Sequence, residues 1–248
     1  MNAPAWLTAR PIAHRGLHDI ASGVIENTTA AALKAVEMNF TIECDVQLSK
    51  DGEAMVFHDA TLDRLMRTTG DLCFRDAREL KTLRYARGED RIITLDMLLA
   101  TIHGRVPLIC EIKSAFDGNM QLAQRTLAVV SAHNGPVALK SFDPAIIAHL
   151  RQLGANMPLG MIAEAHYTDP AWNALSPALK QSLANFLHYE KTRPDFLSWN
   201  VHDLPHAVPC LLRKGLGMPV MAWTVRTPAQ RQLAAQWADQ MLFEGFVP

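Results

Sequence analysis

Eight short apolar runs, alternating with helical patterns, constrain the fold of this 248-residue chain more than any other feature. The runs are rich in residues typical of strands, and amphipathic stretches with helical spacing separate most of them. The predicted strands are residues 11–13, 41–46, 106–112, 136–141, 157–163, 195–200, 219–225 and 241–243. Repeated βα units of this kind predict a TIM (β/α)8 barrel, a fold that commonly takes about this length.

The helical stretches that alternate with these strands are residues 28–38, 120–132, 144–153, 204–214 and 228–237. Several of them begin with Asp or Thr at the cap and Pro in the first turn, as helices often do. An open doubly wound sheet is the main alternative. It is disfavoured because no glycine-rich phosphate loop of the GxGxxG or Walker type follows any predicted strand.

The segment from about residue 60 to 105 is too long for a loop and carries its own helical patterns at 75–83 and 95–102. We expect it to form a small insertion on a single barrel domain that spans residues 1–248. Because it directly follows His58, a candidate site residue, we expect it to form part of the wall around the substrate.

Charge and hydropathy limit the possible partners. The formal net charge is -1 with 20% charged residues, so no broad positive field would attract nucleic acid. No apolar window approaches the roughly 18 residues of a membrane span, and the N-terminus lacks a secretory signal pattern. The four cysteines are too scattered for a disulfide framework or a zinc site. We therefore expect a cytoplasmic protein with reduced thiols and a small phosphorylated ligand.

Two carboxylates, Glu43 and Asp45, end one predicted strand and lie on the same face because side chains alternate along a strand. Asp51-Gly52 is a strong hairpin signal shortly afterwards. A two-residue loop there would set His58 directly opposite Asp45, whereas a three-residue loop would shift the register by one. With either loop, we expect the hairpin to return His58 to the carboxylates.

A second strand repeats this arrangement, with Glu111 and Lys113 on one face at its end. Parallel barrel strands present their C-terminal ends to one rim, so Glu43, Asp45 and Glu111 should converge there. Three adjacent carboxylates repel unless some are protonated or a cation lies between them. Ligands that are all oxygen favour one hard divalent cation, Mg²⁺ or Ca²⁺, over zinc.

The first predicted strand ends in His14-Arg15-Gly16, where Arg15 offers a planar fork for phosphate oxygens and Gly16 permits a tight turn. Further along, Asn27 or Thr28 could cap the helix that follows.

Taken together, these motifs resemble the glycerophosphodiester phosphodiesterase family, within the superfamily of phospholipase C-like phosphodiesterase barrels. The motifs are His14-Arg15-Gly16, Glu26-Asn27-Thr28, the run from Glu43 to Gly52, His58-Asp59 with Leu62 and Arg64, and Glu111-Ile112-Lys113. The match is densest from about residue 12 to 113, with weaker echoes at residues 140–143 and 222–225.

The resemblance implies an enzyme that hydrolyses glycerophosphodiesters to an alcohol and glycerol 3-phosphate. It implies a divalent cation on Glu43, Asp45 and Glu111, and an acid–base pair at His14 and His58. By the same likeness, Arg15 and Lys113 would hold the phosphate and Trp223 would line the glycerol pocket. Trp223 lies between Ala222 and Thr224 in an apolar run, which suits a core position equally well.

The chain departs from the family pattern twice. Phe243-Glu244-Gly245-Phe246 stands where a Thr-Asp pair with a nearby Pro is usual, and Arg226 stands where Asn is common. We expect neither departure to contact the metal ligands or histidines. A lysophospholipase D or another phosphodiesterase on the same scaffold is an alternative, and a catalytically silent barrel that binds a phosphodiester is a less favoured one. The sequence does not determine the leaving alcohol or which of the two metals binds. It also does not determine which histidine is the acid and which the base, or the oligomeric state.

Overall fold

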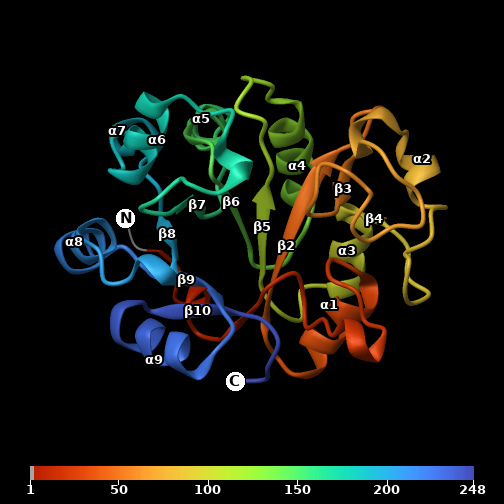
Figure 1. Ribbon diagram of the computed structural model, residues 1–248, viewed down its shortest axis with the longest axis horizontal. Helices are drawn as coiled ribbons and strands as arrows, with labels where there is room; N and C mark the ends of the chain where they lie inside the picture. The colour runs from red at the N-terminus through yellow and green to blue at the C-terminus, as the bar shows by residue number, and fades with distance from the viewer. Residues whose placement is uncertain (1–2) are drawn as a thin grey trace.

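In the computed structural model, which describes residues 3–248, eight parallel strands close into a barrel (Figure 1). The sheet closes because β1 pairs with β2 on one side and with β10 on the other. These strands are β1 (Ile12–Ala13), β2 (Thr41–Leu48), β5 (Leu108–Ile112), β6 (Val137–Ser141), β7 (Leu159–Ala163), β8 (Phe196–Asn200), β9 (Val220–Val225) and β10 (Gln240–Phe243). Each coincides with a predicted strand, so the barrel prediction is confirmed.

Helices surround the strands in Figure 1 and separate them along the chain. The predicted ones form as α1 (Thr29–Glu37), α4 (Gln121–Ser131), α5 (Pro144–Gln152), α8 (Ala207–Leu216) and α9 (Pro228–Trp237). Their ends follow from local chemistry, since Thr28 caps α1 and Thr227 forms a capping box with Gln230 at the start of α9. The connection between β7 and β8 adds α6 (Pro177–Ala184) and α7 (Tyr189–Thr192), which the sequence did not predict.

Short 3-10 helices occupy several connections. They are η1 (Ala5–Leu7), η2 (Ile20–Ser22), η3 (Leu72–Phe74), η4 (Pro170–Trp172) and η5 (Val201–Asp203).

The insertion after the strand that leads to His58 lies to one side of the barrel, in orange and gold in Figure 1. That strand is β3 (Ala54–Val56), and the insertion itself contains α2 (Ala77–Leu80) and β4 (Ile93–Thr94). Strand β3 pairs antiparallel with both β2 and β4. Buried side chains such as Phe57, Leu62 and Tyr85 give it a small core of its own. The following helix α3 (Leu95–Ile102), which falls inside the predicted insertion, packs against α1 and α4 in the outer layer of the barrel.

The hairpin between β2 and β3 differs from the predicted register. Val46 pairs with Val56 and Leu48 with Ala54, so three residues form the loop and the two-residue loop is wrong. The Ser49 hydroxyl explains the difference, because it accepts the Glu53 amide at 2.9 Å and contacts Asp51 at 2.6 Å. Gly52, with φ at 84°, then supplies the left-handed residue that such a three-residue loop requires.

The interior of the barrel is filled at the end opposite the site. Fully buried side chains pack there, including Leu7, Ile12 and Phe196. A Cβ at Gly160 would lie 2.3 Å from the Phe196 ring, so the ring needs a glycine on the neighbouring strand. Only the ends of the strands near His14 and Glu111 therefore remain free for a site. Within residues 3–248, no helix combines the length and apolar character needed to span a membrane.

Candidate active site

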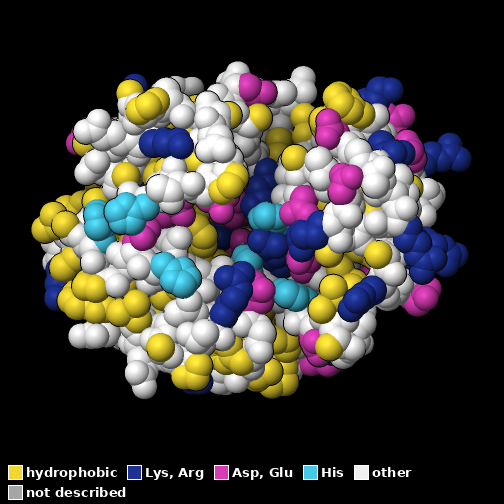
Figure 2. Space-filling view, in the orientation of Figure 1, with side chains coloured by type: hydrophobic (Ala, Val, Ile, Leu, Met, Phe, Trp, Pro, Cys, Tyr) yellow, Lys and Arg dark blue, Asp and Glu magenta, His cyan; other side chains and the backbone are white. Residues whose placement is uncertain are grey.

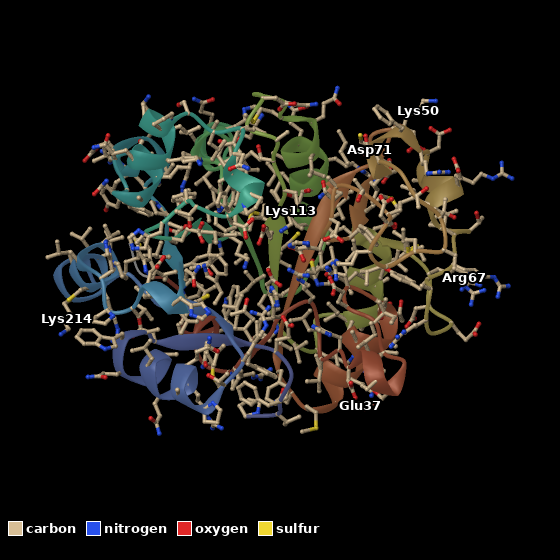
Figure 3. The ribbon with its side chains drawn as sticks, viewed as in Figure 1. Glu37, Lys50, Arg67, Asp71, Lys113 and Lys214 are labelled. Atoms are coloured by element: carbon tan, nitrogen blue, oxygen red, sulfur yellow. The ribbon has the colours of Figure 1, made fainter. Side chains whose placement is uncertain are left out.

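A cavity of about 240 Å³ opens at the C-terminal ends of the barrel strands. In the space-filling view the hollow is lined by basic, acidic and histidine side chains (Figure 2). Figure 3 places Lys113 beside β5, near the middle of the barrel. The predicted site residues that line the cavity are His14, Arg15, Asp45, His58, Glu111, Lys113 and Trp223.

The three predicted metal ligands come together on neighbouring strands. Glu43 and Asp45 lie on β2, and Asp45 is paired in register with Glu111 on β5. One oxygen atom from each carboxylate lies within 4.8 Å of the other two, and all three side chains are buried. Such a cluster of oxygen atoms can hold a hard divalent cation.

Two lysines neutralise much of the negative charge of this cluster. Lys113 Nζ lies 2.7 Å from Asp45 Oδ1 and 2.5 Å from Glu111 Oε1. Lys140 Nζ lies 2.8 Å from Glu43 Oε1 and 3.8 Å from Glu111 Oε2. Burial raises the pKa of the Asp45 carboxyl, but the charges of Lys113 and the other nearby cations outweigh it and hold that pKa well below its usual range. Asp45 therefore stays ionised.

Arg15 connects the cluster to its surroundings. Its backbone amide donates to Glu43 Oε2 at 3.1 Å, and its guanidinium donates to Glu26 Oε1 at 2.7 Å and lies 3.5 Å from Asp45. Asn27 fixes Asp45 from the other side, donating to Oδ2 at 2.9 Å. Arg15 thus lies in the cavity wall with its orientation set by carboxylates.

Each predicted catalytic histidine carries a carboxylate on Nδ1. His14 Nδ1 lies 2.7 Å from Glu244 Oε2, and His58 Nδ1 lies 2.6 Å from Asp59 Oδ1. A neutral imidazole that donates from Nδ1 leaves Nε2 as the free base. Burial raises the pKa of the Asp59 and Glu244 carboxyls, but hydrogen bonds from the histidines and from Arg64 or Arg226 outweigh burial and lower both.

The two departures from the family pattern form one unit, which corrects the expectation that neither contacts the histidines. Arg226 donates to Glu244 at 2.9 Å, and the same carboxylate contacts His14. The two ends of the chain meet here because β1 pairs with β10.

Trp223 is partly buried on β9 and lines the cavity, so it occupies a pocket wall. Its indole Nε1 donates to the Ser198 carbonyl oxygen at 3.0 Å, which fixes the ring. The Phe142 ring stands nearly perpendicular to it, with the centroids 5.5 Å apart.

Sequence reasoning missed Lys140 and Phe142 as wall residues, and it missed Glu244 and Asp59 as partners of the histidines. Lys140 interrupts the apolar run 137–141, and a charged residue in such a run is the sequence signal that could have identified it.

Comparison with known proteins consistently finds similarity to glycerophosphodiester phosphodiesterases. The model of a family described as the glycerophosphoryl diester phosphodiesterase family matches residues 14–247. The glycerophosphodiester phosphodiesterase of Caldanaerobacter subterraneus is 30% identical, with 66% of this chain and 70% of the relative covered. Glycerophosphodiester phosphodiesterase 1 of Bos taurus is 28% identical, with 87% of this chain and 71% of the relative covered.

Solved structures share the fold. An Oleispira antarctica phosphodiesterase, in complex with the product sn-glycerol-3-phosphate, superposes with a TM-score of 0.76 at 22% identity, covering 94% of this chain and 91% of the other. A Thermotoga maritima glycerophosphodiester phosphodiesterase gives a TM-score of 0.71 at 23% identity, covering 94% and 92%.

Proposed function

Because this chain belongs to the glycerophosphoryl diester phosphodiesterase family, we infer that it hydrolyses glycerophosphodiesters to an alcohol and glycerol 3-phosphate. The observation that supports this most is the cavity itself. It brings two carboxylate-paired histidines into the same wall as Asp45 and Glu111, two of the three clustered carboxylates.

The donor set fits one Mg²⁺ or Ca²⁺. Glu43, Asp45 and Glu111 offer only oxygen, and their buried position at the strand ends suits a hard cation. When bound, the ion supplies Lewis-acid activation of the phosphate.

The cations and the aromatic wall of the cavity position the substrate. Lys113 and Arg15 hold the phosphate oxygens, since both line the cavity and carry donors beyond those engaged by carboxylates. Trp223 packs against the glycerol.

The histidines move the protons. The glycerol hydroxyl next to the phosphate gives its proton to Nε2 of one histidine and attacks phosphorus, while the other histidine protonates the departing alcohol oxygen. Water then opens the resulting cyclic phosphate, which restores the hydroxyl and yields glycerol 3-phosphate. Intramolecular attack is favoured because the nucleophile is already positioned within the substrate.

Turnover of glycerophosphocholine with and without EDTA tests the proposal. We expect release of choline that stops in EDTA and resumes with added Mg²⁺ or Ca²⁺. Faster hydrolysis of lysophosphatidylcholine would instead identify a lysophospholipase D. Binding without turnover of either substrate would identify a silent barrel.

We also propose that the enzyme works in the cytoplasm. All four cysteines are free, and Cys73 is exposed, which suits a reducing compartment. Cell fractionation followed by immunodetection tests this location.

A further inference from the structure

A second cavity, of about 570 Å³, adjoins the first. The two share six wall residues, namely His58, Glu111, Lys113, Phe142, Asn200 and Trp223. A group attached to a phosphate held at Lys113 can therefore extend into the second cavity without leaving the protein surface.

Aromatic rings form much of the wall of this second cavity. Trp172 on η4 lies with its ring centroid 4.9 Å from that of Phe142 and 6.3 Å from that of Phe116. Phe142 in turn contacts Trp223. All four side chains line the cavity and are only partly buried, so ring surface is available to a ligand.

A buried carboxylate stands among these rings. Glu164 directly follows β7, is 6% exposed, and accepts a hydrogen bond from Asn200 at 3.0 Å through Oε2. Its other oxygen, Oε1, is buried, and the polar groups that stabilise the carboxyl, on Asn200 and Trp172, are both uncharged. Burial raises the pKa of this carboxyl and outweighs the hydrogen bonds of Asn200 and Trp172, which lower it, because no cation among the described residues lies nearby.

Glu164 differs from the other buried acids in the two cavity walls because it has no cationic partner in the part of the chain that the structure describes. Asp45 and Glu111 both pair with Lys113, whereas Glu164 forms no ion pair within residues 3–248. A buried carboxylate without a counter-charge is costly unless a ligand supplies the charge.

We propose that this second cavity binds the leaving alcohol of the substrate and selects one that carries a quaternary ammonium, such as choline. The inference rests on the proposed function and names its substrate class. The cation would supply the missing partner of Glu164, and its methyl groups would lie against the rings of Trp172 and Phe142. A neutral alcohol such as glycerol or inositol would leave Glu164 uncompensated.

The proposal is tested with two substrates whose leaving alcohols have nearly the same shape but differ in charge. Glycerophosphocholine is compared with the glycerophosphodiester of 3,3-dimethylbutan-1-ol, in which carbon replaces the choline nitrogen. We expect the native enzyme to favour the choline ester in kcat/KM by about tenfold, the size of a desolvated cation–π contact together with a charge pair. In Glu164→Gln, which can still accept from Asn200, this ratio should fall to about threefold or less, because only the contact with the rings remains.

Glu190→Gln is the matched control. It makes the same chemical change on α7, in the same β7–β8 connection, at a side chain that is 79% exposed and lines neither cavity. It should keep the native ratio. Trp172→Leu should lower the ratio by removing an indole ring while keeping an apolar side chain.

Calorimetric titration with choline alone and with 3,3-dimethylbutan-1-ol separates this proposal from the proposed function. Choline binding that depends on Glu164, without turnover of any diester, would overturn the hydrolase function and support the subsite. Turnover with equal kcat/KM for the two esters, and choline binding no tighter than that of the neutral alcohol, would overturn the subsite and leave the hydrolase function standing.

Discussion

Glu244 Oε2 accepts a hydrogen bond from His14 Nδ1 at 2.7 Å, although the two residues are 230 positions apart in the sequence. The contact depends on barrel closure, because β1 and β10 carry the two side chains to one point of the rim. Glu244 is held in turn by Arg226. A carboxylate in this position fixes the orientation and the tautomer of the imidazole.

Replacement of Glu244 by Gln should lower kcat by about 10- to 100-fold with little change in KM, because the amide removes the negative charge and can reverse the tautomer. Steady-state kinetics with glycerophosphocholine measure this. Arg226→Gln leaves the carboxylate in place and should cost less than about threefold. A native kcat in Glu244→Gln would show that His14 does not act as an acid or base.

His14→Ala and His58→Ala should each lower turnover by about 100-fold or more, since each removes a proton-transfer group. Metal affinity, measured by titration calorimetry, should stay nearly native because neither histidine belongs to the carboxylate cluster. His149→Ala, on the outer helix α5, is the control and should be fully active. Loss of metal binding in a folded His14 or His58 variant would make that histidine a ligand.

Glu43→Gln should abolish metal binding and also destabilise the fold. Lys140 is 2% exposed and lies 2.8 Å from Glu43, so neutralising its partner leaves a buried charge. We expect a loss of about 3–5 kcal/mol in the free energy of unfolding, measured with urea. The double variant Glu43→Gln/Lys140→Met should recover most of this stability without recovering metal binding. Identical urea midpoints for the native protein and the single variant would exclude an energetically important pair.

The nucleophile can be identified with a substrate that lacks it. The 2-deoxy analogue of glycerophosphocholine should bind with similar affinity but turn over at least about 100-fold more slowly, because the missing hydroxyl acts in the transition state. Phosphorus NMR of quenched reactions with the normal substrate should show a cyclic phosphate. Equal turnover of both substrates without a cyclic species would indicate direct attack by water.

Sequence pattern predicted the strands and the convergence of carboxylates because these features depend on local spacing. Glu43 and Asp45, like Glu111 and Lys113, share a face through the period of two, and parallel strands carry both pairs to one rim. Features that depend on closure or on single side-chain contacts were not predictable in this way.

Three examples show what local spacing leaves undetermined. Glu244 reaches His14 only through the pairing of the first and last strands. The hairpin register depends on the Ser49 hydroxyl, which selects a three-residue loop. The walls around Glu164 come from separate βα connections, and no local pattern joins them.

A buried histidine outside the site should govern part of the acid sensitivity. Burial lowers the pKa of His188 from its ordinary 6.5 to about 4, and its Nε2 has no partner. Between these two values the unfolded chain binds more protons than the folded one, so stability falls as the pH falls through that window. Acidification from pH 7.5 to 5 should cost about 2 kcal/mol through this group.

His188→Phe provides the comparison, since the new ring can pack against Phe186 as the imidazole does at 4.6 Å. Urea unfolding at both pH values should show a pH dependence about 2 kcal/mol smaller in the variant than in the native protein. Parallel pH profiles for the two proteins would contradict a role for this histidine.

The net charge of the carboxylate cluster and its cationic neighbours bears on how strongly the product is held. Three acids, Glu43, Asp45 and Glu111, face three bases, Arg15, Lys113 and Lys140, so the cluster is close to neutral by itself. With a divalent cation bound it carries a surplus of about two positive charges. A phosphodiester offers one negative charge against that surplus, whereas a phosphate monoester offers nearly two at neutral pH. Coulomb attraction should therefore favour glycerol 3-phosphate over the substrate that yields it, and we expect this product to inhibit the enzyme.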